Sequence, residues 1–186
     1  MFRKLLLAVS LIISCTVVLR SQTTGNCVID VIMSGYSPRM FTADPVPDQH
    51  LDLILKCGIK APSASNRQPW KFTVVKDATL TGEAVNGILP ENVLIFVSRA
   101  GDNQRADLDC ALATQSMFVA AQGLGLGARI YTGPVNNVNT NLKEKLGIPE
   151  GYQVVTILRI GHMDKSVDAT SAATPRKPIE EVVNYK

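Results

Sequence analysis

The stretch that decides the fold, Ala61–Phe72, reads Ala-Pro-Ser-Ala-Ser-Asn-Arg-Gln-Pro-Trp-Lys-Phe. Pro62 and Pro69 fix φ and push the residue before each of them toward extended geometry, so the segment is a stiff loop. Its serines and its asparagine can hydrogen-bond either the backbone or a ligand. On residue chemistry alone, this composition fits either a rigid ligand-binding loop or a proline-rich connector in which the Trp70 side chain packs into the core.

The segments on either side of the loop have clear periodicity. Between Pro47 and Gly58, apolar residues recur at helical spacing, which predicts a helix that ends at the glycine. From Trp70 to Val75, apolar and polar residues alternate, which predicts a strand. The loop therefore connects a helix to a strand.

Two further apolar runs predict the centre of the molecule. Val93–Val97 and Gln153–Ile160 are nearly continuous apolar segments of strand length, typical of strands buried on both faces. Such strands require helices on both sides. An alanine-rich pattern from about Ala106 to Gly123 predicts the main core helix, and a shorter helix capped by Asn139 or Thr140 is expected before the last strand.

Composition excludes several classes of function. The chain has 186 residues, enough for one domain with a full core, and a net charge of +3. Its lysines and arginines are scattered, so we expect no nucleic-acid partner. Cys27, Cys57 and Cys110 form no disulfide framework, and the latter two fall on helical patterns that predict small buried thiols. His50 and His162 lack neighbouring ligands, so no metal site is predicted.

The N-terminus predicts export. Residues 1–21 have the charged start and apolar run of an export signal, which leaves 28–186 as the folded domain. Ile12-Ile13-Ser14-Cys15 resembles a lipoprotein signal, in which Cys15 would be lipidated. Because the apolar run continues to Leu19, cleavage near Ser21 and retention as a membrane anchor remain open. The expected location is the bacterial periplasm, free or as a membrane-attached lipoprotein.

One glycine-rich motif is rejected as a dinucleotide site. Gly123-Leu-Gly-Leu-Gly-Ala128 matches the dinucleotide fingerprint, and Glu144 follows at a suitable distance. The fingerprint requires a strand before it and a helix after it. Here a long helix precedes the glycines, and Arg129-Ile130-Tyr131 is a strand start, so we interpret them as a helix C-terminus followed by close packing.

The central loop resembles the Ala-Pro-Ser-x-x-Asn-x-Gln-Pro-Trp-x-Phe signature of the FMN-dependent nitroreductase family. Further matching motifs follow the family order from about Ile29 to Val183, including Ser37-Pro-Arg-Met-Phe41, the Gly-Leu-Gly segment and a closing Arg-x-Pro at Arg176. The resemblance implies an α+β, nitroreductase-like fold with a mainly antiparallel central sheet flanked by helices. It also implies an intertwined homodimer that binds FMN at its interface.

The resemblance assigns a set of cofactor-binding residues, while no side chain is implied as a catalytic acid or base. Ser37, Arg39 and Arg176 would hold the flavin phosphate, and the backbone of Ile130–Gly133 would pass beside the isoalloxazine, where an N–H can bond flavin N5. The full set is Ser37, Arg39, Asp109, Tyr131, Thr132, Gly133 and Arg176 from one chain, with Pro62, Ser63 and Ala64 from the other, and Asn66 of the signature.

Two departures from the family pattern concern the phosphate site. Gly35 and Thr174 stand where the family usually has cations. Each charge-assisted hydrogen bond contributes about 1.5 to 3 kcal/mol, so weaker FMN binding is expected. The implied activity is hydride transfer from NAD(P)H to FMN and then to an electron-poor acceptor such as a nitroaromatic or a quinone. The alternative is a flavin-binding or interaction protein that keeps the fold with weak or no turnover.

Overall fold

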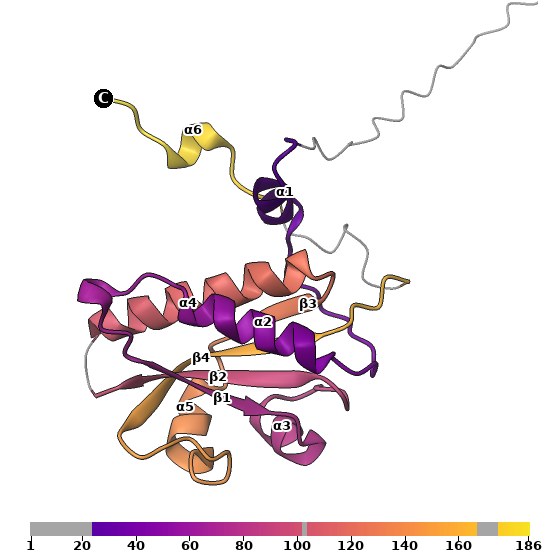
Figure 1. Ribbon diagram of the computed structural model, residues 1–186, viewed down its shortest axis with the longest axis vertical. Helices are drawn as coiled ribbons and strands as arrows, with labels where there is room; N and C mark the ends of the chain where they lie inside the picture. The colour runs from indigo at the N-terminus through magenta and orange to yellow at the C-terminus, as the bar shows by residue number, and fades with distance from the viewer. Residues whose placement is uncertain (1–23, 102–103, 167–174) are drawn as a thin grey trace, which may run out of the picture.

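A computed structural model describes residues 24–101, 104–166 and 175–186, which build one four-stranded sheet with helices on both faces (Figure 1). The strands are β1 (Trp70–Val75), β2 (Val93–Ala100), β3 (Gly127–Tyr131) and β4 (Tyr152–Gly161). They lie in the order β1-β2-β4-β3, and every neighbouring pair is antiparallel. The predicted antiparallel central sheet flanked by helices is confirmed.

Most of the described helices form two layers around this sheet. The described helices are α1 (Cys27–Ser34), α2 (Asp48–Ile59), α3 (Ala78–Ala84), α4 (Gln104–Gly123), α5 (Val135–Asn137) and α6 (Ile179–Val182), with a 3₁₀ turn η1 (Ala64–Asn66) and a π turn η2 (Val138–Leu142). Figure 1 shows α2 and α4 over one face of the sheet, and α3 and α5 over the other. The helix predicted from Asn139 starts earlier, directly after Pro134, because proline favours the start of a helix.

The core divides between the two faces of β2 and β4, as their continuous apolar runs require. Val93, Ile95 and Val97 pack on the side of α2 and α4, whereas Leu94 and Phe96 pack on the side of α3 and η2. None of the five side chains is more than 2% exposed. Both faces of β2 are therefore covered, which explains why its sequence does not alternate.

The cysteines of the two long helices differ from the prediction. Cys110 of α4 is fully buried, and burial raises the pKa of its thiol to about 12. Cys57 of α2 is exposed, so the prediction that it is buried is wrong. The buried face of α2 carries Leu51, Ile54 and Gly58, and Cys57 lies off that stripe.

Two helices lie outside the two-layer body. Figure 1 shows α1 and α6 projecting beyond it, and neither helix has a buried residue. Ile32 and Met33 of α1 are 55% and 74% exposed, and Ile179 and Val182 of α6 are 58% and 62% exposed. Both helices therefore present apolar side chains to solvent in a single chain.

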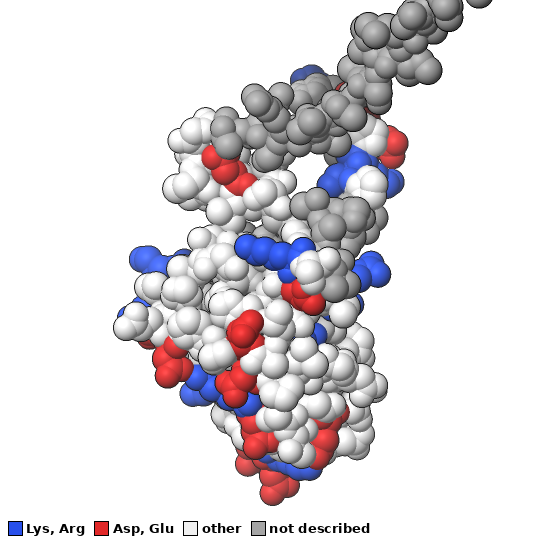
Figure 2. All heavy atoms as spheres, turned by 90° about the vertical axis from the view of Figure 1, so that its right-hand side faces the viewer, with Lys and Arg blue, Asp and Glu red and all other residues white. Residues whose placement is uncertain are grey.

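The surface is mixed in charge. Figure 2 shows acidic and basic side chains interspersed between broad uncharged areas on the face that it presents. None of the helices that the structure describes combines the length and apolarity that a membrane span requires. The predicted N-terminal signal, with Cys15, lies outside the described residues, as does Thr174.

Candidate functional site

The central loop is strained and internally hydrogen-bonded. Ser65, Asn66 and Gln68 have φ values of 51°, 55° and 48°, a left-handed conformation that costs non-glycine residues of order 1 to 3 kcal/mol each. The Gln68 N–H donates to Ser63 Oγ at 3.0 Å, and the Asn66 N–H donates to the Ser63 carbonyl at 3.0 Å. Because Ser63 Oγ accepts this bond, its own hydroxyl proton can be donated to a ligand.

A buried carboxylate fixes the loop to α4. Asp109 is only 5% exposed, and its Oδ1 accepts the backbone N–H of Ala64 at 3.1 Å. The structure therefore brings Asp109 to Ala64 of its own chain, whereas the resemblance assigns these two residues to a site from different chains. A direct contact of Asp109 with a flavin stays a prediction.

Two of the predicted phosphate ligands meet in one pocket. Ser37, from the segment after α1, and Arg176, from the segment before α6, both line a pocket of about 280 Å³. Gln115 of α4 and Ile130 of β3 line the same pocket. Arg39 is exposed and is not among the residues that line it.

The same pocket leaves little room for a side chain at Gly35, where the resemblance implies a cation. A Cβ on Gly35 would collide with Gln122 Oε1 and lie 3.0 Å from the Val31 carbonyl. Gln122 is itself held, because its Nε2 donates to the Tyr36 carbonyl at 2.5 Å. A larger side chain at position 35 therefore requires the Gln122 side chain to move.

The predicted flavin-facing backbone directly follows β3. β3 ends at Tyr131, and Thr132 and Gly133 follow as exposed residues. Ile130 lines the pocket of Ser37 and Arg176, and Val135 lines a second cavity of about 630 Å³. Residues 131–133 therefore connect, along the chain, two residues that line different pockets.

Helix α4 contributes lining residues to the two pockets. Gln115 lines the first pocket and Asp107 lines the second. They are eight residues apart, which is about 12 Å along a helix at 1.5 Å per residue. Helix α4 therefore contributes to both pockets at two well-separated positions.

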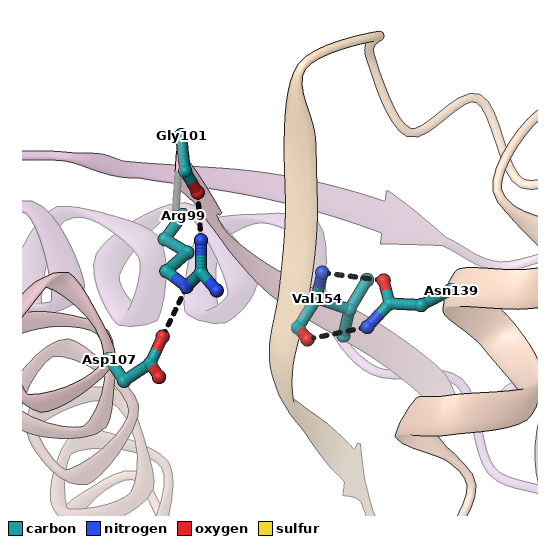
Figure 3. Close-up of polar contacts among 5 residues, drawn as sticks. All are labelled: Arg99, Gly101, Asp107, Asn139 and Val154. Atoms are coloured by element: carbon teal, nitrogen blue, oxygen red, sulfur yellow. Dashed lines mark hydrogen bonds and ion pairs between the residues drawn. The ribbon is translucent and has the colours of Figure 1, made fainter. Parts of the chain in front are cut away.

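The second cavity has polar walls (Figure 3). Arg99 Nε donates to Asp107 Oδ1 at 2.5 Å, and the Arg99 guanidinium also bonds the Gly101 carbonyl. On the other side, Asn139 Nδ2 donates to the Val154 carbonyl at 2.9 Å, and Asn139 Oδ1 accepts the Val154 N–H at 2.8 Å. The Asn139 amide thus pairs with β4 in place of a neighbouring strand, because β3 ends at Tyr131 opposite Ile157.

Sequence reasoning missed this cavity. Its walls come from β2, α4, α5, η2 and the start of β4, segments that are far apart in the chain and share no motif. Asn139 was expected only as a helix cap. Its partners could be found only once the end of β3 was placed opposite β4.

A second residue that sequence reasoning missed is Arg159 of β4. It is 3% exposed, and its Nε and Nη2 donate to Asn92 Oδ1 at 2.8 and 2.5 Å. Its guanidinium carbon lies 3.9 Å from the centre of the Phe41 ring. Burial lowers the pKa of Arg159, and a hydrogen bond with Tyr131 opposes that effect. Arg159 thus anchors the segment that carries Ser37 and Arg39 to the sheet, beside β3.

The described residues offer no metal centre. Across 24–101, 104–166 and 175–186, no three His, Cys, Asp or Glu side chains gather in a way that could hold a metal ion. The hydroxyl and the guanidinium that line the pocket of Ser37 and Arg176 suit an anionic group of a ligand.

Comparison with protein families gives one clear match. The model of the nitroreductase family matches residues 32–92 and 84–162. An NADPH-flavin oxidoreductase of Vibrio harveyi is 29% identical over 181 residues, which cover 86% of this chain and 73% of that protein.

Solved structures agree with the family match. The NADPH:FMN oxidoreductase of Vibrio harveyi, complexed with NAD⁺, superposes with a TM-score of 0.73 at 25% identity, covering 86% of this chain and 77% of that one. A Desulfovibrio desulfuricans structure in complex with FMN gives a TM-score of 0.73 at 26% identity, covering 87% of this chain and 97% of that one.

Proposed function

Because this chain belongs to the nitroreductase family, we propose that it is an FMN-dependent oxidoreductase that passes hydride from NAD(P)H to an electron-poor acceptor such as a nitroaromatic or a quinone. The NADPH-flavin oxidoreductase relative and the neighbour complexed with NAD⁺ support the donor class. The observation that carries the proposal is the joint lining of one pocket by Ser37 and Arg176, next to the end of β3.

The residues of this pocket fit the phosphate end of FMN. A hydroxyl and a guanidinium suit a phosphate, because both can donate hydrogen bonds and the guanidinium can do so bidentately. Residues 131–133 directly follow Ile130, which lines the same pocket. FMN, when bound, would accept hydride from NAD(P)H and transfer it to the acceptor.

The chain contributes binding and orientation rather than acid–base chemistry. Ser37 and Arg176 would bind the phosphate, and the backbone N–H groups of residues 131–133 would orient the ring. Arg159 anchors the segment that carries Ser37 to the sheet, because it stacks on Phe41 and bonds Asn92, which in turn donates to the Thr42 carbonyl. Asp109 holds Ala64 in place, so that Ser63 and its neighbours can present their polar groups to a ligand.

We also infer that a second copy of the chain completes the site. Leu108 and Leu112 of α4 are 64% and 37% exposed, an unusual state for a central helix. With the apolar faces of α1 and α6, they give this chain a surface suited to an intertwined homodimer. In that dimer, Pro62, Ser63 and Ala64 would act in the partner's site. Size-exclusion chromatography with light scattering tests this proposal, and a monomer at micromolar concentration would exclude it.

The cofactor assignment is tested by spectroscopy on the purified protein. After addition of FMN and removal of the excess, we expect a retained flavin spectrum whose long-wavelength band disappears anaerobically with NADH or NADPH. The double variant Ser37→Ala/Arg176→Gln should retain much less flavin, because the two predicted phosphate donors that line the pocket are lost. A protein that retains no FMN at high concentration would contradict the proposal and favour a role without turnover.

Export remains a separate proposal that rests on the pattern of residues 1–21. We propose that the folded domain acts in the periplasm, either free or attached through Cys15. Mass spectrometry of the mature N-terminus distinguishes a lipidated Cys15, cleavage near Ser21 and an uncleaved anchor. An unprocessed, cytoplasmic chain would contradict export.

A further inference from the structure

The guanidinium of Arg159 is buried among neutral groups. Arg159 is 3% exposed, and across residues 24–101, 104–166 and 175–186 it takes part in no ion pair with a carboxylate. Its Nε and Nη2 donate to Asn92 Oδ1, and its Nη1 donates to the Gly87 carbonyl at 3.3 Å. Burying a charge without a carboxylate is costly, and an apolar side chain of similar size would avoid that cost.

The contacts of Arg159 converge on segment 38–42, which directly follows Ser37. The guanidinium carbon lies 3.9 Å from the centre of the Phe41 ring, an arrangement that is strongest away from water. Asn92, which accepts two hydrogen bonds from Arg159, donates from its Nδ2 to the Thr42 carbonyl at 2.8 Å. Arg159 therefore holds the end of this segment both directly and through Asn92.

Two glycines let the same segment pack directly on the backbone of the sheet. A Cβ on Gly127 of β3 would lie 2.9 Å from Pro38 Cγ and 2.9 Å from Phe41 Cε1, too close for packed carbon atoms. A Cβ on Gly161 of β4 would lie 3.0 Å from Phe41 Cδ1. The last glycine of the rejected dinucleotide motif, Gly127, thus provides the space for Pro38 and Phe41.

This packing leaves the predicted phosphate ligands on the surface. Pro38 and Phe41 are buried, whereas Ser37 and Arg39 are exposed. Ser37 lines its pocket from the position directly before Pro38. The place of the Ser37 hydroxyl therefore depends on how firmly Pro38 and Phe41 are held.

Arg159 itself faces away from that pocket. Leu158 and Ile160, its neighbours in β4, pack on the side of α2 and α4. Because successive residues of a strand alternate between its faces, Arg159 points to the other side. The pocket of Ser37 is lined by Gln115 and other residues of α4, and Arg159 is not among its lining residues. An effect of Arg159 on a ligand in the pocket would pass through segment 38–42.

We propose that Arg159 is a positioning residue for the phosphate end of FMN. It holds segment 38–42 on the sheet so that Ser37 can donate to the phosphate, and it makes no contact with the cofactor. This inference rests on the proposed function. Because the isoalloxazine would be bound by the backbone of residues 131–133, loss of Arg159 should affect the phosphate and leave the ring contacts in place.

The test compares FMN with riboflavin, which has the same ring and ribityl chain and lacks the phosphate. Fluorescence titration gives the affinity of the purified protein for each flavin. Arg159→Met should weaken FMN binding by about tenfold and riboflavin binding by less than about twofold. Asn92→Asp keeps an acceptor for Arg159 and removes the donor to the Thr42 carbonyl, so it should show the same selective loss for FMN.

Arg129→Met is the matched control. Arg129 of β3 lies directly opposite Arg159 in the register of the two strands, and its guanidinium carbon lies 5.0 Å from the centre of the Tyr131 ring. The variant removes the same charge from the same face of the sheet and leaves Phe41 and Asn92 untouched. It should not change the ratio of FMN affinity to riboflavin affinity.

A second measurement follows the segment without any flavin. The Thr42 N–H donates to the His162 carbonyl at 2.9 Å, and its hydrogen exchange should be faster in Arg159→Met and unchanged in Arg129→Met. Unchanged exchange in Arg159→Met would overturn the positioning role. An equal loss of FMN and riboflavin affinity, or the same selective loss in Arg129→Met, would also overturn it. A wild type that binds no FMN would overturn the proposed function instead, and exchange in the flavin-free protein would still decide whether Arg159 holds the segment.

Discussion

Asn139 is a single, partly buried amide, and its substitution by alanine should nevertheless strongly destabilise the fold. The side chain makes two hydrogen bonds, at 2.9 and 2.8 Å, to the carbonyl and the N–H of Val154, which is 3% exposed. Without them, both backbone groups of Val154 lose their partners beyond the end of β3. An unsatisfied buried group costs about 1 to 3 kcal/mol, so we expect a loss of about 2 to 4 kcal/mol in the free energy of unfolding.

The measurement is urea unfolding of the wild type and of two variants. Asn141→Ala is the matched control, because Asn141 lies in the same turn η2, is exposed, and bonds only the side chain of Asn137 at 2.8 Å. It should change the free energy of unfolding by less than about 0.5 kcal/mol. A loss in Asn139→Ala no larger than that of Asn141→Ala would refute the view that the amide replaces a strand.

Two further predictions concern α4. The pKa of Cys110 in the folded state, about 12, lies above its reference value of 9.0, so the folded state keeps the proton longer. The stabilisation from the protonated thiol is therefore present below pH 9 and is lost as the pH rises toward 12, by about 1.4 kcal/mol per pH unit. In urea unfolding over this pH range, Cys110→Ala should lose less stability than the wild type. A variant that loses as much as the wild type would contradict this cause. Asp109→Ala should speed amide hydrogen exchange at Ala64 and weaken FMN binding about tenfold. Asp109→Asn keeps a hydrogen-bond acceptor, so it should retain most of the exchange protection and most of the FMN affinity. Equal behaviour of the two variants would argue against the bond to Ala64 as the cause.

The sequence predicted the positions of the strands more reliably than the burial of individual side chains. The patterns of β1, β2 and β4 located these strands to within a few residues, because a strand buried on both faces needs a continuous apolar run. The motif around Ala61–Phe72 led to the nitroreductase family, which the family comparison confirms. The prediction for Cys57 was wrong because apolar periodicity locates a helix more reliably than it shows which of its side chains are buried.

What the sequence determined by itself was the family, the order of the elements and the residues that carry its motifs, because each of these is written in local spacing. Only the tertiary structure decided which of those residues meet. Ser37 and Arg176 line one pocket although they are far apart in the sequence. Asp109 accepts a hydrogen bond from Ala64 of its own chain. Asn139 takes the place of a strand beside Val154 because β3 ends at Tyr131, opposite Ile157. Such contacts depend on where strands end and how helices cross them, and these are set by packing between distant segments.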